Sequence, residues 1–535
     1  MPHFHEAFRQ LDRCLIERMQ AFRTPALVMS LTDRIQSIRV SALGHADLGA
    51  REPVRADHLF SIGSIGKSFT GIACLQAHDA GLLDLHAQVS QYLPWFEVKN
   101  PYEPITIHHL LTHSAGLPRG TDFSPDPRAE VYGLRELEVG FAPGKHFCYS
   151  DIGYKILGLV LEAVTGKPYA QVIREQILLP LEMHDTCAVT TSSLRPRAAS
   201  GYRSLYDDRP ASASHPLVPA EWVETSSADG CILSTAEDMA KYARMLLNDG
   251  SGPHGELLSR ASYQKMVLPM MEDEGESYSY GLHLFKDDGY QIAGHGGDVP
   301  GYESYMWLDL DNGLGSVVLM STPYTPRASF LTLEFFRAAY LGHQLPDTPP
   351  LPNFTHVKDP SQYAGTYQSE SGSLTFAAEN HHLLMLCGNQ RVVLEERGID
   401  RFYADHPDWN LFLFNFGRSA AGEVVEITYG SQWFVNDCYQ GPRSFETPAE
   451  WAAYAGHYRS HDPWETNFRV FSRKGQLIYV APGGDEEPLI FLGADMFRIG
   501  EDDYIPERLC FDQVVNGHAL RALRSGCPYY RFFTP

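Results

Sequence analysis

The chain has 535 residues, of which 44% are hydrophobic and 12% are aromatic. At about 150 residues per domain, this length predicts roughly three or four domains, and the apolar content is enough for folded cores, which excludes a disordered protein. The 66 acidic residues outnumber the 43 basic ones and give a formal net charge of −23. Such an acidic surface disfavours nucleic acids and anionic membranes, so we expect neither as a partner.

The amino terminus and the cysteines bear on the cellular compartment. The first ten residues lack the basic and apolar regions of a secretory signal, and no stretch reaches the length of about 18 apolar residues that a membrane span needs. The nine cysteines are scattered without C-x-x-C spacing, which is typical of thiols in a reducing compartment. We therefore expect a cytoplasmic protein, although removal of a leader peptide would leave the same pattern.

Residues 1–345 alternate between helical and strand-like patterns, which predicts an α+β domain. We expect helices on an antiparallel sheet, with an all-helical lobe between about residues 73 and 247. Helical periodicity marks residues 6–23, 67–82 and 154–165, and apolar runs typical of buried strands mark residues 26–31 and 314–320.

The first segment that indicates chemistry is Ser64-Ile65-Gly66-Lys67, an S-x-x-K pattern that opens a predicted helix. Three residues are close to one helical turn, so the hydroxyl and the amine lie on one face. Ser64 also lies near the positive end of the helix dipole. The pair is a candidate nucleophile beside its proton acceptor, although the pattern alone also fits a solvated pair on an amphipathic helix.

Two further segments follow in the order that a three-part active site needs. Tyr149-Ser150-Asp151 comes shortly after a Pro-Gly turn, and His295-Gly296-Gly297 lies within a glycine-rich run. The irregular residues 190–226 contain four prolines and are expected to border the substrate pocket.

Three competing interpretations are weaker. The segment before Lys67 nearly matches the phosphate-binding G-x-x-x-x-G-K-[ST] pattern, but Ser61 replaces the first glycine. An α/β-hydrolase G-x-S-x-G elbow would need a glycine where this chain has isoleucine. His109 and His113 have the spacing of a zinc pair on an apparent helix, but Leu110 stands where a metalloprotease has its glutamate. A packed helix with hydrogen-bonded histidines is the better interpretation.

The ordered set S-x-x-K, Y-x-D and H-x-G resembles the serine β-lactamase and penicillin-binding-protein superfamily, whose members carry S-x-x-K, Y-x-N and K-x-G or H-x-G. Residues 105–118 (ITIHHLLTHSAGLP) and 230–238 (GCILSTAED) are also similar to segments of that superfamily. The resemblance covers roughly the first 340 residues and points to the branch of class C β-lactamases, D-aminopeptidases and esterases. It implies a two-lobed fold with the site at the junction of the lobes.

The resemblance implies roles for four side chains. Ser64 attacks a carbonyl, Lys67 and Tyr149 remove and return its proton, and His295 completes the far side of the network. Which of Lys67 and Tyr149 is the base stays open. Either one would need a lowered pKa, because both unperturbed values are about 10 or higher.

The same resemblance implies the substrate contacts. The backbone N–H groups of Ser64 and Asp298 would form the oxyanion hole, and Gly296 and Gly297 fit a strand edge that substrate approaches closely. Asp151 departs from the usual asparagine, since an ionised carboxylate can only accept hydrogen bonds. It would repel an acylated amide oxygen and attract a free ammonium, unless it is protonated or paired with Lys67.

The sequence pattern changes after residue 345, from mixed helices and strands to short strands alone. Residues 346–360 are rich in proline and read as a linker, and short strands follow. The segment QYAGTY at residues 362–367 recurs as AYAGHY, 91 residues later. Two copies of a unit of about 85 residues predict two small closed antiparallel β-barrels, lipocalin-like, over residues 361–445 and 446–535.

A β-lactamase-like domain followed by two barrels resembles the D-aminopeptidase arrangement, in which a loop of the last barrel reaches toward the site. Residues 481–487 are a candidate for that loop, although an exposed acidic turn is the better interpretation. The barrels could equally stabilise the enzyme or form a homodimer.

These observations predict a serine hydrolase that acts through an acyl-enzyme on Ser64. A D-stereoselective aminopeptidase or amidase is the first choice, and a class C-like β-lactamase, a D,D-peptidase or a carboxylesterase are the alternatives. A non-catalytic ligand-binding protein is the alternative from another class. No metal or organic cofactor is implied, and the expected partner is a small peptide, amide or ester substrate.

Overall fold

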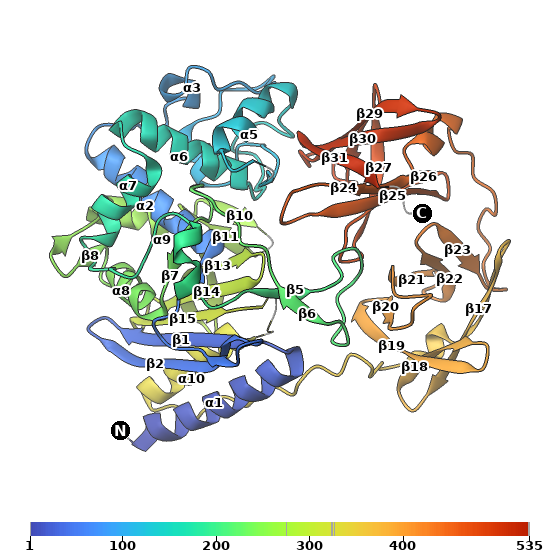
Figure 1. Ribbon diagram of the computed structural model, residues 1–535, viewed down its shortest axis with the longest axis horizontal. Coiled ribbons are helices and arrows are strands. Elements are labelled where there is room, and N and C mark those ends of the chain that lie inside the picture. Colours follow the sequence, from blue (N-terminus) through green and yellow to red (C-terminus); the bar gives the residue numbers. More distant parts are fainter. Residues whose placement is uncertain (1, 123, 274, 323–324, 326, 533–535) are drawn as a thin grey trace.

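A nine-stranded sheet lies at the centre of the first 341 residues (Figure 1). The computed structural model describes residues 2–122, 124–273, 275–322, 325 and 327–532. All neighbouring strands pair antiparallel, in the order β10 (Met271–Asp273), β11 (Glu276–Tyr278), β12 (His283–Asp287), β13 (Tyr290–Val299), β14 (Tyr302–Asp309), β15 (Leu314–Met320), β1 (Ala26–Asp33), β2 (Ser37–Asp47) and β3 (Glu52–Pro53).

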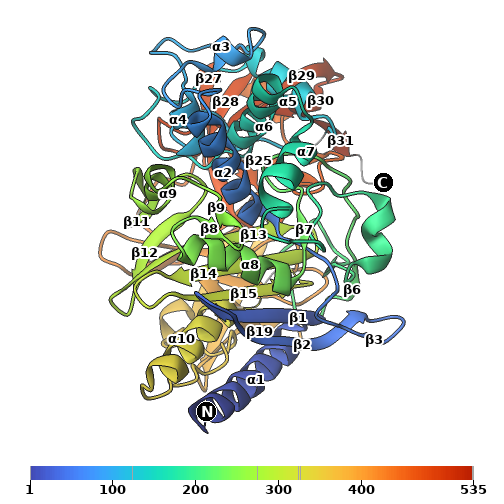
Figure 2. The same ribbon diagram turned by 90° about the vertical axis from the view of Figure 1, so that its left-hand side faces the viewer.

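Helices cover both faces of this sheet (Figure 2). Along β1 the side chains alternate, so that Leu27 and Met29 pack with α1 and α10 while Val28 joins the core on the opposite face. Burial on both faces explains why β1 and β15 are continuous apolar runs in the sequence. The predicted α+β class is therefore correct.

The helices are α1 (Pro2–Phe22), α2 (Gly66–Asp79), α3 (Val89–Tyr92), α4 (Ile107–Leu111), α5 (Pro127–Gly133), α6 (Asp151–Thr165), α7 (Tyr169–Ile173), α8 (Ala236–Leu247), α9 (Arg260–Val267) and α10 (Ala328–Leu341). Helices α3 to α7 form a lobe around α2. Helix α8 packs instead on β1 and β15, so the helical lobe ends earlier than predicted. None of the helices described here has the length and apolar character needed to cross a bilayer.

Two closed eight-stranded antiparallel barrels follow. The first consists of β16 (Gly365–Ser369), β17 (Gly372–Glu379), β18 (His382–Cys387), β19 (Gln390–Gly398), β20 (Arg401–Ala404), β21 (Phe414–Arg418), β22 (Val424–Tyr429) and β23 (Gln432–Val435). The second consists of β24 (Gly456–Arg459), β25 (Asn467–Arg473), β26 (Gln476–Val480), β27 (Glu486–Gly493), β28 (Met496–Ile499), β29 (Arg508–Val515), β30 (His518–Arg524) and β31 (Cys527–Phe532).

The sequence repeat marks equivalent positions in the two barrels. Tyr367 in the first barrel donates its hydroxyl to the backbone oxygen four residues earlier, and Tyr458 in the second does the same. Both side chains are buried. The repeated sequence therefore encodes the same turn of chain at the entrance to each barrel.

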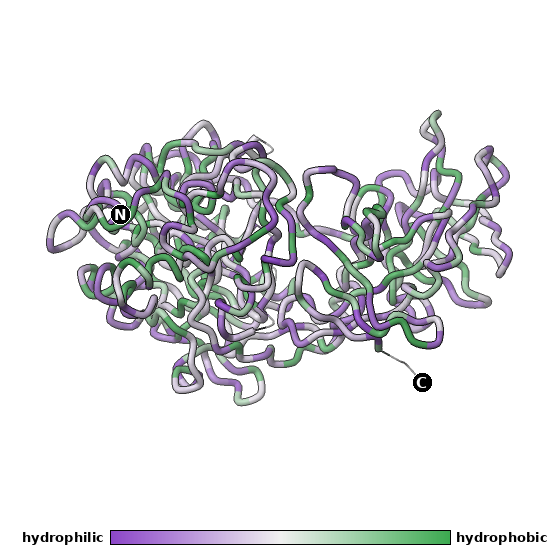
Figure 3. The backbone as a smooth tube through the Cα atoms, turned by 90° about the horizontal axis from the view of Figure 1, so that it is seen from above, coloured by the Kyte–Doolittle hydropathy of each residue, from purple (hydrophilic) through white to green (hydrophobic). Residues whose placement is uncertain are grey.

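A hairpin of the first domain contacts both barrels. It consists of β5 (Tyr202–Ser204) and β6 (Leu217–Pro219), and it extends toward the barrels in Figure 1. Its turn bonds to both of them, since Arg209 donates to Asn410 at 3.1 Å and Asp208 pairs with Arg469 at 3.0 Å. Seen from above, the first domain and the barrels lie at opposite ends of the long axis (Figure 3).

Candidate active site

Ser64 and Lys67 meet at the start of α2, as their spacing predicts. Ser64 lies in a 3₁₀ turn, Gly63–Ile65, that leads directly into the helix. The Lys67 ammonium is fully buried and donates to Ser64 Oγ at 2.9 Å and to the backbone oxygen of Asp229 at 3.0 Å. The hydroxyl lines a cavity while the amine lies beneath it.

Tyr149 and Asp151 reach the same place from the start of α6. Between them, Ser150 caps the helix by accepting a hydrogen bond from Gly153 N at 3.1 Å. The Lys67 nitrogen lies 4.9 Å from the centre of the Tyr149 ring. The helix cap therefore holds both the phenol and the carboxylate close to Lys67.

Asp151 is paired with Lys67, one of the two possibilities that the sequence left open. Its Oδ1 lies 2.6 Å from Lys67 Nζ, and its Oδ2 lies 3.7 Å from Arg119 Nε. Burial alone would raise the pKa of Asp151, but the charges of Lys67 and Arg119 outweigh burial and lower it. The carboxylate is ionised and already engaged before any substrate arrives, although it still lines the cavity.

We predicted that the catalytic base, Lys67 or Tyr149, would have a lowered pKa, but neither group has one in this structure. Burial would lower the pKa of Lys67, but the neighbouring charges of Asp151, Tyr149 and Asp229 raise it well above its usual range. The pKa of Tyr149 is also raised, because burial outweighs the effect of the Lys67 charge. Lys67 is thus an ammonium that donates to Ser64, and one proton must leave before Ser64 can be activated.

Strand β13 brings His295 and the two glycines to the cavity. The His295 ring lies 6.1 Å from the Tyr149 ring, and its Nε2 lies 3.1 Å from the hydroxyl of Tyr278. Burial, reinforced by His283 and Lys67, lowers the pKa of His295 well below its usual value, so the imidazole is neutral. Its Nδ1 faces the backbone oxygen of Gly296 at 2.5 Å.

The glycines permit a close approach of β13 to the Ser64 turn. A Cβ on Gly297 would lie 1.9 Å from the backbone oxygen of Ile62, and a Cβ on Gly63 would lie 2.9 Å from Asp298 N. Neither position can carry a side chain without moving backbone. This contact places the backbone nitrogen of Asp298 beside the turn that carries Ser64.

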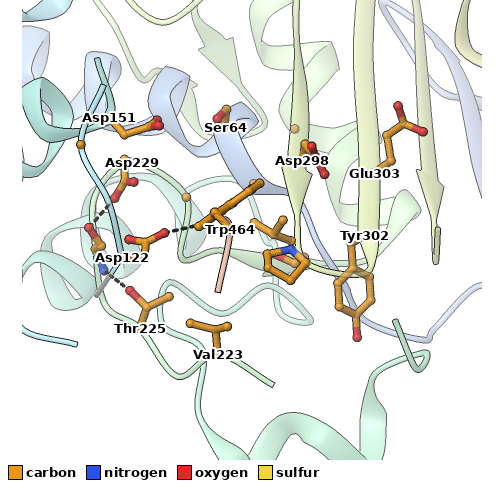
Figure 4. A pocket seen from close by; sticks show the side chains of 18 of the residues that line it. Ser64, Asp122, Asp151, Val223, Thr225, Asp229, Asp298, Tyr302, Glu303 and Trp464 are labelled. Carbon is orange, nitrogen blue, oxygen red and sulfur yellow. Dashed lines mark hydrogen bonds between the residues drawn. The ribbon is translucent and has the colours of Figure 1, made fainter. Parts of the chain in front are cut away.

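The cavity above Ser64 has a volume of about 510 Å³ and is strongly acidic (Figure 4). Arg119 and Arg524 also line it. Its carboxylates come from the first domain and from the second barrel: Asp122, Asp151, Glu221, Asp229, Asp298, Glu303, Asp462 and Glu465.

The second barrel supplies one wall of the cavity. The wall is the loop between β24 and β25, where Trp464 donates its indole N–H to Asp122 Oδ2 at 2.5 Å. Residues 481–487, the loop considered from the sequence, lie elsewhere, because Asp485 pairs with Arg401 of the first barrel at 2.8 Å. A barrel loop does reach the site, but it is a different loop from the candidate.

Residues 190, 221–223 and 225 also line the cavity, in agreement with the expectation for the irregular segment. Several other lining or supporting residues carried no recognisable spacing in the sequence: Arg119, Asp229, Tyr278, His283, Glu303 and Trp464. Two of these positions had a signal, because Arg119 directly follows the segment of residues 105–118 and Asp229 directly precedes the segment of residues 230–238. Tyr278, His283 and Glu303 are brought in by strand pairing, and Trp464 is brought in by the docking of the second barrel.

The two histidines with zinc-like spacing have structural roles. Helix α4 ends at Leu111, so His113 lies beyond it, with a left-handed φ of 54°. Its Nδ1 accepts a hydrogen bond from Ser150 N at 3.0 Å, and His109 Nδ1 accepts one from Thr106 N at 3.2 Å. Their shared helix was predicted wrongly, but the hydrogen bonds agree with the interpretation that they are packing residues.

A serine that lines a cavity and is paired with a buried lysine, beside a tyrosine and at the junction of a helical lobe and an antiparallel sheet, defines the class of serine acyl-transfer enzymes built on the β-lactamase fold. The Beta-lactamase family matches residues 11–335, and the chain belongs to this family.

The sequences of known relatives agree with this family assignment, and a solved structure agrees with the fold. The chain is 25% identical over 419 residues to a penicillin-binding protein of Bacillus subtilis (strain 168), covering 73% of this chain and 90% of that protein. It is 29% identical over 352 residues to Penicillin-binding protein 4 of Amycolatopsis lactamdurans, covering 62% and 90%. The octameric penicillin-binding protein homologue from Pyrococcus abyssi is similar in fold, with a TM-score of 0.59 and 23% identity over 80% of this chain and all of that one.

Proposed function

We propose that this serine hydrolase cleaves small amides through an acyl-enzyme on Ser64, and that it is a D-stereoselective aminopeptidase or amidase. In the proposed reaction Ser64 Oγ attacks the carbonyl, its proton passes to Lys67 or Tyr149, and the same groups return a proton to the leaving amine. The distance of 2.9 Å between Lys67 Nζ and Ser64 Oγ supports this assignment.

The acidic cavity is the observation that carries the preference for a free amino group. Most substrates of an acyl-transfer enzyme gain nothing from carboxylates near the acyl group, whereas an ammonium gains a charge-assisted hydrogen bond. Several of the lining carboxylates already have partners, such as Asp151 with Lys67 and Glu465 with Arg524. The amine must therefore be held by a carboxylate that still faces the cavity.

Asp298 and Glu303 are the best candidates for that contact. They stand directly opposite each other on β13 and β14, an arrangement that is unfavourable for two carboxylates unless a cation joins them. Asp298 lines the cavity, and desolvation there raises the pKa of its carboxyl to about 6, although the charge of Arg119 opposes the shift. Burial raises the pKa of Glu303 to about 7, and its oxygens accept hydrogen bonds from Tyr305 and Thr325. A bound ammonium would relieve the repulsion.

The barrel wall supports a short acyl group. Trp464 and its neighbours close the cavity on the side of residues 119–122, and the enclosed volume of about 510 Å³ lies within the range of small-molecule sites. A long peptide amino-terminal to the cleaved bond would collide with this wall. D-stereoselectivity itself rests on the resemblance to the three-domain D-aminopeptidase arrangement.

The names of the relatives support penicillin binding as a second candidate activity. An N-acylated β-lactam needs a donor for its side-chain amide oxygen, and Asp151 in its ionised form cannot supply one. An ester is easier to attack and tolerates a looser site, so esterase activity is a third possibility.

We keep a homodimer and a cytoplasmic location as proposals, the latter supported by the buried thiols of Cys74 and Cys231.

A hydrolysis panel tests the proposed function. We expect D-alanine p-nitroanilide to be cleaved with a kcat/KM at least about tenfold higher than its L-isomer or its N-acetyl derivative, which corresponds to about 1.4 kcal/mol. A chromogenic cephalosporin and a short-chain nitrophenyl ester complete the panel. Faster cleavage of the N-acetyl compound or of the cephalosporin would replace the aminopeptidase proposal with a peptidase or β-lactamase.

The contact of Asp298 with the amine has its own test. Asp298→Asn is expected to raise KM for D-alanine p-nitroanilide by about tenfold, because one charge-assisted hydrogen bond is lost, and to leave the N-acetyl substrate nearly unchanged. Glu221→Gln is the matched control, since Glu221 lines the rim of the same cavity and is paired with Arg203 at 2.8 Å. An equal loss on both substrates would assign Asp298 a structural role.

A further inference from the structure

A buried ion cluster lies directly beneath the wall of the cavity, outside the machinery described above. Lys155 on α6 is 2% exposed, and its ammonium donates to Asp122 Oδ1 at 2.6 Å, to Glu130 Oε2 at 2.8 Å and to the backbone oxygen of Thr121. The three donors of the ammonium thus have three acceptors. Burying such a charge costs several kcal/mol, and only this saturated geometry offsets the cost.

The cluster fixes the segment of residues 118–122, which is also tied to the start of α6. Ser150 Oγ donates to Pro118 O at 2.7 Å, and the N–H groups of Asp151 and Ile152 donate to Arg119 O at 2.7 and 3.1 Å. The Arg119 guanidinium lies 3.7 Å from Asp151 Oδ2. The 118–122 segment therefore both caps the helix that carries Asp151 and supplies the second cation next to that carboxylate.

The same segment is held from the other side by the second barrel. Glu507, which precedes β29, accepts a hydrogen bond from Arg119 N at 2.7 Å, and Trp464 bonds to Asp122 (Figure 4). A chain of direct contacts thus runs from Trp464 through Asp122 to Lys155, and from Glu507 through Arg119 to Asp151 and Lys67.

We propose that Lys155 is a positioning residue for the proposed reaction. Through the 118–122 segment, Lys155 couples the docked position of the second barrel to the Asp151–Lys67 pair beside Ser64. This inference rests on the proposed acyl-enzyme chemistry, but not on the choice of substrate. Without the Lys155 charge, Asp122 and Glu130 would lose the cation that they share, and the 118–122 segment would move away from α6. Arg119 would then lose its place next to Asp151.

The test measures the second-order rate at which a fluorophosphonate probe labels Ser64 in the full-length protein. We expect Lys155→Met to label about 10 to 100 times more slowly than wild type, because small misplacements of catalytic groups have effects of this size. Arg337→Met is the control, since Arg337 forms an equally buried pair with Asp309 at 2.6 Å, far from the cavity. It should lower the melting temperature and leave the labelling rate within about twofold of wild type.

A double-mutant cycle separates positioning from general destabilisation. Trp464→Phe removes the indole donor to Asp122, and it is expected to slow labelling about threefold in wild type but less than about 1.5-fold in Lys155→Met, because both changes act through Asp122. Multiplicative effects would refute the coupling, as would wild-type labelling by Lys155→Met. Should Lys155→Met fail to fold, Trp464→Phe combined with Glu507→Gln replaces it, with slowed labelling expected and an unchanged rate refuting the inference. Absence of labelling in wild type would instead refute the proposed function.

Discussion

Replacing Ser64 by alanine is expected to lower kcat/KM by about 10⁴-fold or more, because no other described group in the cavity is placed to form the acyl-enzyme. The fold should survive. Ser64 Oγ accepts one hydrogen bond from Lys67, which keeps Asp151 and the backbone oxygen of Asp229 as partners, so the free energy of unfolding should change by at most about 1 kcal/mol. Steady-state kinetics and a thermal melt measure the two quantities.

A matched control is available in the same cavity. Ser61 also lines the cavity and lies three residues before Ser64, on β4 (Phe60–Ser61). Among the described residues, Ser61 forms no hydrogen bond with Lys67, whereas Ser64 does. Ser61→Ala should keep nearly full activity and full labelling by a fluorophosphonate. Turnover retained by Ser64→Ala, or mass-spectrometric labelling at another residue, would contradict the nucleophile assignment.

Replacing Asp151 by asparagine is the second change with a large expected effect. The direction in which the pKa of Lys67 should move follows from the Asp151–Lys67 ion pair. Asp151 Oδ1 lies 2.6 Å from Lys67 Nζ and helps to raise the pKa of the ammonium. An opposite charge at this distance shifts a pKa by about 1 to 3 units, so its removal lowers the pKa of Lys67. If Lys67 is the base, the rise of kcat/KM with pH moves to lower pH by about one unit or more.

The measurement is the pH dependence of kcat/KM for wild type and Asp151→Asn, with Glu221→Gln as the control that leaves the profile in place. A profile that does not move would exclude Lys67 as the base. A shift to lower pH fits either Lys67 or Tyr149, because the charge of Asp151 raises the pKa of both groups. In the substrate panel, the side-chain amide introduced by Asp151→Asn can donate to an acylated substrate, so N-acetyl and β-lactam substrates should gain relative to D-alanine p-nitroanilide. A gain for the amine substrate would contradict our interpretation of this position.

The same variant has a consequence for stability. The pKa of Asp151 is lowered in the folded protein, so the carboxylate contributes stability above about pH 4 and this contribution is lost as the pH falls further. Asp151→Asn should therefore reduce the free energy of unfolding at neutral pH, and the difference from wild type should shrink on acidification. Denaturant titrations at neutral and acidic pH test this.

Local geometry explains why much of the fold and the site could be predicted. Lys67 follows Ser64 by one turn of the chain, so their contact hardly depends on the rest of the protein. Likewise, β1 and β15 are recognisable as apolar runs because both of their faces are buried, and the barrel repeat is visible because each copy needs the same tyrosine contacts. The helical lobe was placed less well, since α8 is a good helix by itself and only its packing assigns it to the sheet.

The barrel loop and the partner of Asp151 show why the rest could not be predicted. The Asp485 loop and the Trp464 loop are both polar turns in the sequence, and only the orientation of the barrel brings Trp464 to Asp122 and Asp485 to Arg401. Asp151 could have faced a substrate amine, stayed protonated or paired with Lys67. The outcome depends on two cations from other segments of the chain, Lys67 at 2.6 Å and Arg119 at 3.7 Å.

The family, a candidate nucleophile with its neighbouring lysine, the glycine-rich strand and the two barrels could be predicted from the residues alone, because these features depend on short spacings and on periodicity. Only the tertiary structure decided the charge state of the site, the wall that the second barrel contributes and the Lys155 cluster beneath it. The physical reason is that pKa values and ion pairs are set by which charges share a buried volume, and that volume is assembled from segments far apart in the chain.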